Sequence, residues 1–189
     1  MMSEPPGKRT RTRHRLVTNA LDLFEAQGFD DTTVAQITAR ARVSEMTFFR
    51  YFASKEMVVL DDPHDPVIAE SVVAQPATLP PLVRVARGLR AAFAQVDEPE
   101  DLTTRRRVRV VAGSPALRAG MVRSNAATEA AIADALIADG VAPLPARVAA
   151  ASVLAALTCA LLEWATTQDG TTLADAVTTA LDTVEVTSA

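Results

Sequence analysis

Two helix-start signals stand close together in residues 33–55, and they limit this part of the chain to short helices. Thr33 is followed three positions later by Gln36, which is the capping-box pattern of a helix N-terminus. Ser44 is a second residue of the type preferred at N-caps. We therefore expect a helix of about two turns over residues 34–41 and another short helix over 45–52, joined by a tight turn.

Apolar residues recur at helical spacing along the rest of the chain, with no strand pattern and no internal repeat. The first of these helices ends before Gly28, a residue that commonly closes helices in a left-handed conformation. About nine helices are expected, at 9–27, 34–41, 45–52, from 55, 82–96, 102–112, 117–136, 146–168 and 173–184. The fold class predicted is all-α.

The segment Asp61–Pro66, DDPHDP, does not suit a continuing helix and marks the expected domain boundary. The domains predicted are 9–60 and 61–189. The net charge is −4, yet residues 1–60 carry nine basic against seven acidic side chains, which leaves +2 there and −6 in the remainder. This charge asymmetry favours an N-terminal part that binds an anionic partner.

The composition argues against several function classes. The single cysteine, Cys159, suits a reducing cytoplasm, and the N-terminus lacks the apolar core of a secretory signal. The uncharged run Val148–Leu162 is shorter than a bilayer span requires, so no membrane partner is expected. Two histidines without metal-ligand spacing, and no phosphate-binding glycine loop, predict no enzyme, no metal site and no cofactor.

A longer supporting helix followed by two short helices is typical of a helix-turn-helix unit, whose second short helix fits the major groove of DNA. The stretch LFEAQGFDDTTVAQITARARVSEMTFFRYFASKE resembles the DNA-binding domain of the TetR family of transcriptional repressors. The matching positions are Gly28, Phe29, Thr33, Val34, Ile37, Ala41, Val43, Ser44, Thr47, Tyr51, Phe52 and Lys55. The resemblance covers about residues 9–60.

The resemblance implies a set of DNA-contacting residues. These are Thr33, Arg42, Ser44, Glu45, Met46, Thr47, Phe49 and Lys55. Arg42 replaces the family's glycine in the turn, where a left-handed residue would cost about 1–2 kcal/mol. Glu45 either points to solvent or accepts a hydrogen bond from a cytosine amino group. Lys55 is either a phosphate contact or a solvated lysine.

Phe48 and Phe52, four positions apart, are expected to face the core rather than DNA. Arg9, Arg11 and Arg13 form either a mobile arm along the DNA or a solubilising tail.

The C-terminal part resembles the family in its helical plan, which implies a homodimer through the last two helices, about 146–168 and 172–184. A monomeric bundle is the alternative. Candidate residues for an effector pocket are Leu89, Phe93, Arg109, Met121, Asn125, Thr128, Cys159, Glu163 and Trp164. For the polar ones, a hydrogen-bonded place in the core is the competing interpretation.

The arginine run 105–109 either pairs with the acidic residues at 97–101 or turns one arginine inward to attract an acidic ligand. The segments TFFRYF and GSPALRAGMV resemble mycofactocin-type and acyl-CoA-sensing members of the family. The function predicted is a repressor that an apolar or acidic small molecule releases from its double-stranded DNA operator. The alternative is a helix-turn-helix protein without an inducer.

Overall fold

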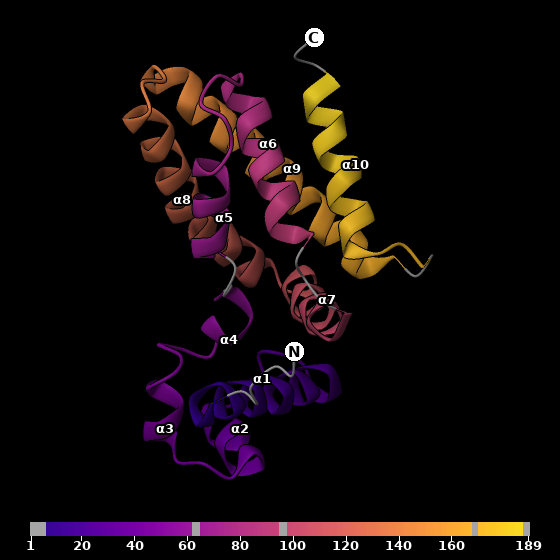
Figure 1. Cartoon of the computed structure of the whole chain (residues 1–189). Coiled ribbons are helices and arrows are strands. Elements are labelled where there is room, and N and C mark those ends of the chain that lie inside the picture. The colour runs from indigo at the N-terminus through magenta and orange to yellow at the C-terminus, as the bar shows by residue number, and fades with distance from the viewer. Residues whose placement is uncertain (1–6, 62–64, 95–97, 168–169, 187–189) are drawn as a thin grey trace, which may run out of the picture.

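The computed structural model describes residues 7–61, 65–94, 98–167 and 170–186. These residues form ten α-helices and no strand (Figure 1). The helices are α1 Lys8–Gln27, α2 Val34–Ala41, α3 Glu45–Phe49, α4 Met57–Leu60, α5 Asp65–Val73, α6 Pro81–Phe93, α7 Glu98–Gly113, α8 Pro115–Ala138, α9 Pro143–Thr166 and α10 Leu173–Val186. The all-α prediction is confirmed.

The three N-terminal helices pack around one apolar cluster. Phe24 of α1, Ile37 of α2 and Phe48 of α3 are buried in it, and Phe52 lies beside Phe48 with ring centroids 5.6 Å apart. The expectation that Phe48 and Phe52 face the core is confirmed. The cluster also includes Val111 and Leu117 at the junction of α7 and α8, so the C-terminal part closes the core of the N-terminal part.

The larger part is a bundle in which α9 contacts α6, α7, α8 and α10. In the described part of the chain, only α9 is long and apolar enough to cross a membrane by length and composition. The uncharged run Val148–Leu162 lies inside this helix, which has 24 residues. Its buried face belongs to the bundle core, together with α6 and α10, and this packing explains its apolar character.

The sequence reading missed α5 and placed several helix starts too late. Proline occupies one of the first helical positions of α6, α8 and α9, where its fixed φ suits the helix and its missing N–H costs nothing. Because prolines were taken as helix breaks, the helices that start at or beside Pro66, Pro81, Pro115 and Pro143 were missed or shortened. In the structure α6 begins at Pro81 instead of residue 82, α8 at Pro115 instead of 117, and α9 at Pro143 instead of 146.

Candidate nucleic-acid interface and ligand cavity

The start of α2 is held by a complete capping box. The Gln36 amide N–H donates to Thr33 Oγ1 at 3.2 Å, and the Thr33 amide N–H donates to Gln36 Oε1 at 2.8 Å. The cap thus uses the Thr33 side chain, while the helix N-terminus remains at the surface with its partial positive charge. A phosphate contact by Thr33 stays a prediction.

The turn between α2 and α3 is a Schellman motif built on an arginine. Arg42 has φ 54° and ψ 49°, the left-handed conformation that glycine adopts without strain. Its N–H donates to Ala39 O at 3.2 Å, and the Val43 N–H donates to Thr38 O at 3.0 Å. Arg42 thus carries the strain of a left-handed residue, and its exposed side chain adds a cation to the turn.

The recognition helix α3 has one buried and one open face. Ser44 caps it by accepting from the Thr47 N–H at 3.2 Å, and the two hydroxyl groups lie 3.0 Å apart. Phe48 is buried, whereas Met46 and Phe49 are 84% and 53% exposed. Both side chains are therefore available for contact with a partner. Glu45 is exposed beside them.

Lys55 has a structural role within the domain. Its Nζ donates to the carbonyl oxygens of Phe29 and Thr32 at 2.7 and 2.8 Å and lies 4.1 Å from the centre of the Phe29 ring. These bonds tie the loop before α2 to the loop after α3. The alternative of a solvated lysine does not fit these contacts, and the phosphate contact stays a prediction.

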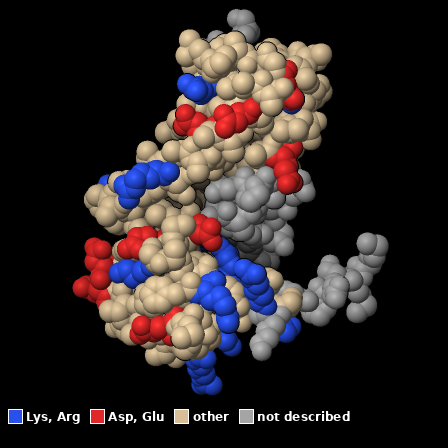
Figure 2. Space-filling model, turned by 90° about the vertical axis from the view of Figure 1, so that its left-hand side faces the viewer, with Lys and Arg blue, Asp and Glu red and all other residues tan. Residues whose placement is uncertain are grey.

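Basic side chains gather on the N-terminal part, with acidic side chains beside them (Figure 2). The exposed basic residues there are Arg9, Arg11, Arg15, Arg40, Arg42 and Arg50. Arg40 pairs with Asp22 of α1 at 3.3 Å. The mixed surface suits a protein that binds DNA through a limited patch rather than along its whole surface.

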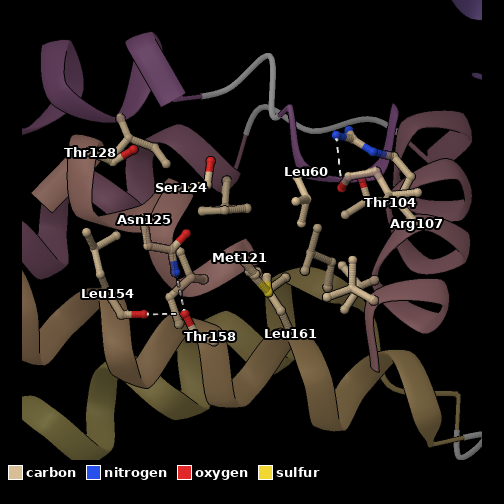
Figure 3. A pocket seen from close by; sticks show the side chains of 17 residues that line it. Leu60, Thr104, Arg107, Met121, Ser124, Asn125, Thr128, Leu154, Thr158 and Leu161 are labelled. Carbon is tan, nitrogen blue, oxygen red and sulfur yellow. Dashed lines mark hydrogen bonds between the residues drawn. The ribbon is translucent and has the colours of Figure 1, made fainter. Parts of the chain in front are cut away.

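An internal cavity of about 70 Å³ lies between α4, α7, α8 and α9 (Figure 3). Its wall is mainly apolar, with the polar side chains of Thr104, Arg107, Ser124, Asn125, Thr128 and Thr158. Asn125 donates through Nδ2 to Thr158 Oγ1 at 2.9 Å, and Thr158 donates to Leu154 O at 2.8 Å. These bonds fix the Asn125 amide in the cavity wall.

The structure divides the nine predicted pocket residues into three groups. Phe93, Met121, Asn125 and Thr128 line the cavity. Cys159, Glu163 and Trp164 instead line an outer groove of about 560 Å³ between α9 and α10. Leu89 is buried in the bundle core, and Arg109 is exposed, with its Nε donating to Ala165 O at 3.1 Å. Whether any of them binds a ligand stays a prediction.

The arginine in the cavity wall is Arg107, not Arg109. Arg107 lies four positions before the buried Val111, on the inward stripe of α7, and this spacing identifies it once Val111 is known to be buried. Its Nη2 donates to the carbonyl oxygens of Val59 on α4 and of Asp61, the residue that follows α4. The neighbouring Arg106 points to α1.

Arg106 joins the two parts of the chain through ion pairs. Its guanidinium donates to Asp22 and Glu25 of α1 at 2.7 Å. These bonds, to Glu25 first and then Asp22, raise the pKa of Arg106 further above its usual value. The acidic residues at 97–101, the other expected partners of this arginine run, lie outside the described side chains. Sequence reasoning missed this bridge because Asp22 and Glu25 are far away along the chain.

No group of three potential metal ligands occurs among the described residues.

A capped pair of short helices with an open second helix, carried by a helical bundle, defines the helix-turn-helix transcriptional regulators. Residues 16–61 match the family described as bacterial regulatory proteins, tetR family, and residues 79–188 match the MftR C-terminal domain. The chain belongs to the TetR family and is a DNA-binding transcriptional regulator.

Two curated relatives support the assignment. The regulator TcmR of Streptomyces glaucescens is 40% identical over 95 residues, which are 49% of this chain and 42% of TcmR. MftR of Mycobacterium tuberculosis, named for the regulation of mycofactocin biosynthesis, is 31% identical over 115 residues, or 59% of this chain and 57% of MftR. The matches span about half the length of these relatives. Both are named as transcriptional regulators.

Solved structures share the fold. A TetR-family regulator from Syntrophomonas wolfei has a TM-score of 0.62 at 22% identity, covering 95% of this chain and 96% of that one. FadR of Thermus thermophilus, a repressor solved with lauroyl-CoA, has a TM-score of 0.50 at 23% identity, covering 92% and 93%. At these identities the likeness concerns the fold alone.

Proposed function

We propose that the protein is a cytoplasmic, homodimeric repressor that binds its operator through α3 and leaves it when a small molecule occupies the C-terminal bundle. The exposed face of α3 carries this proposal. Met46 and Phe49 are the exposed large hydrophobic side chains of the described N-terminal part, and Ser44 and Arg42 hold the helix that presents them. An apolar side chain in the major groove contacts thymine methyl groups.

Dimerisation is supported by the outer groove between α9 and α10. Its apolar wall includes the small residues Ala156, Ala160, Ala176 and Ala180, which allow another helix to approach closely. A second copy of the chain would fill this groove about a two-fold axis with the same residues from each protomer. Two recognition helices would then face successive half-sites, as helix-turn-helix dimers require.

A charge placed in the groove tests the dimer. Ala160→Arg should give a monomer in analytical ultracentrifugation, with its helical circular dichroism retained, because an unpaired guanidinium would be buried at the contact. Val122→Arg is the matched control, since Val122 is 65% exposed on α8, outside the groove. An Ala160→Arg protein that remains a dimer would assign the contact to another surface.

The effector proposed is a mainly apolar molecule with a polar group. The cavity wall combines leucine, valine and phenylalanine side chains with the fixed amide of Asn125. The lauroyl-CoA bound by the Thermus thermophilus FadR is one molecule of this chemistry. At about 70 Å³ the cavity is smaller than the roughly 300–1,000 Å³ of drug-sized sites, so binding requires the surrounding helices to move.

The same small volume favours a second candidate function, a constitutive DNA-binding regulator without an effector. The two candidates differ in one measurement. An effector should lower operator affinity and raise the thermal stability of the bundle, because it binds only the folded protein. A constitutive regulator would keep its operator affinity with every apolar ligand, including one that stabilises the bundle.

Operator recognition is tested by selecting duplexes from a random DNA pool and measuring their affinity at several salt concentrations. Thr47→Ala should weaken binding of the selected duplex while leaving the dimer intact, and log K should fall steeply with log[salt]. Glu45→Ala should relax the selected sequence at one cytosine if Glu45 reads a base. A Thr47→Ala protein that binds as tightly as the unaltered protein would argue against recognition through α3.

A further inference from the structure

Two hollows in this molecule lie next to each other and have two lining residues in common. The inner one is the cavity of about 70 Å³, and the outer one is a groove of about 430 Å³ between α4 and α8. The groove is lined by Ser54, Glu56, Met57, Leu60, Ala116, Gly120, Arg123 and Ser124. Leu60 and Ser124 line both hollows, so both side chains lie where the cavity and the groove adjoin.

Leu60 lies against bare backbone where the two hollows adjoin. A Cβ atom added to Gly120 would be 2.7 Å from Leu60 Cδ1, closer than any side chain could sit. The lack of a side chain at Gly120 therefore lets Leu60 seat directly on α8. Leu60 belongs to α4, a helix of four residues, and points into the cavity region between Ser124 and the α7 side chains (Figure 3).

We propose that Leu60 is the gate through which the effector passes from the α4–α8 groove into the inner cavity. The inference rests on the proposed function, because it presumes that the cavity receives an effector. Moving one leucine side chain off Gly120 joins the two hollows. The path needs no disruption of the α9 contacts that hold the bundle together.

The two hollows also define the class of ligand. The cavity behind Leu60 is walled by Phe93, Val108, Leu157 and Leu161, which suits an apolar chain. The groove mouth carries Ser54, Glu56 and Arg123. A hydrogen bond from Ser54 lowers the pKa of Glu56 and keeps it charged. The ligand that fits both is elongated, apolar along its length, and has a polar end group that remains in the groove.

The position of the gate links ligand entry to the DNA-binding part. The carbonyl oxygens of Val59 and Asp61, on either side of Leu60, accept from Arg107 of α7. The Asp61 carboxylate also accepts from Arg13 of α1 at 2.9 Å. A displacement of Leu60 that moves α4 strains these hydrogen bonds. Because Arg13 belongs to α1, the movement is transmitted directly to α1. Ligand entry and the change in operator affinity would thus share one short helix.

Thiol accessibility tests the gate without knowledge of the effector. The reporter is Leu157→Cys, a buried position in the cavity wall, in a Cys159→Ser background that removes the exposed native thiol. The rate of alkylation by N-ethylmaleimide is measured in the full-length dimer. Leu60→Ala should accelerate alkylation about tenfold, and the milder Leu60→Val should give an intermediate rate, because local opening becomes easier.

Leu161→Ala is the matched control, since it truncates a leucine in another part of the cavity wall, away from the groove. It should change the rate by less than about twofold under conditions where the protein stays folded. Equal acceleration by Leu161→Ala and Leu60→Ala, or an unchanged rate in both Leu60 variants, would overturn the proposal. Operator affinity of the alkylated protein is measured separately. Unchanged affinity with a Leu60-dependent rate would count against the proposed effector response while leaving the gate in place.

Discussion

Replacing Arg42 with glycine should make the DNA-binding part more stable and its DNA binding weaker. Arg42 is the only described non-glycine residue with positive φ, and among the described residues its exposed side chain makes no hydrogen bond or ion pair. The two backbone bonds of the Schellman motif do not involve that side chain. Glycine would therefore keep the turn, remove the strain, and delete one cation next to the recognition helix.

The expected gain in stability is the difference of two terms. A left-handed L-residue costs about 1–2 kcal/mol, and glycine loses roughly 0.5–1 kcal/mol more than alanine in backbone entropy on folding. The net gain in the free energy of unfolding is about 0.5–1 kcal/mol. For a chain of this size each kcal/mol raises Tm by about 2–4 °C, so a rise of about 1–4 °C is expected.

Urea and thermal unfolding, followed by circular dichroism, measure the first effect, and salt-dependent titration of a selected operator duplex measures the second. If Arg42 contacts one phosphate, the slope of log K against log[salt] should fall by about 1 in the glycine variant. Arg42→Lys is the control, since lysine keeps both the charge and the strain. A glycine variant no more stable than the lysine variant would refute the account of strain in this turn.

Three further substitutions test the packing and the connection between the two parts. Phe48→Ala empties the centre of the N-terminal core and should cost about 3–5 kcal/mol in urea unfolding, whereas a loss below about 1 kcal/mol would contradict its place there. Gly88→Ala should cost about 1–3 kcal/mol, because its Cβ would lie 2.6 Å from the Val72 Cα, while Gly113→Ala, with nothing within 4 Å, should not destabilise. Equal stability of these two alanine variants would argue against close contact of α5 and α6. Arg106→Gln should cost less than about 1 kcal/mol, and the cost should shrink in 1 M salt if it is electrostatic.

The helix-turn-helix unit could be predicted in detail because its signals are local. The capping box at Thr33, the cap at Ser44 and the buried pair of Phe48 and Phe52 each depend on residues within four positions of one another. The side of a helix that faces a cavity depends instead on neighbours far along the chain. Arg107 rather than Arg109 lines the cavity, and its spacing to Val111 indicates this only once the packing of α7 shows that Val111 is buried.

Other differences arise from partners that local reasoning does not provide. Lys55 has the surface character expected of a phosphate contact, yet two carbonyl groups from the loop before α2 hold its ammonium group. Cys159 and Glu163 lie on the same helix as cavity residues but on its outer face. The polarity of α9 does not distinguish the face that lines the cavity from the face that lines the outer groove.

The adjacent arginines Arg106 and Arg107 explain how α7 can control the orientation of the DNA-binding part. Successive residues on a helix point about 100° apart, so Arg106 reaches Asp22 and Glu25 of α1 while Arg107 reaches the carbonyl groups of α4. The partly exposed ion pairs contribute at most about 1 kcal/mol each after solvent screening. That is the size of a typical coupling free energy, about 1–3 kcal/mol. A ligand that displaces α4 therefore needs only a modest preference for the displaced state to change operator affinity measurably.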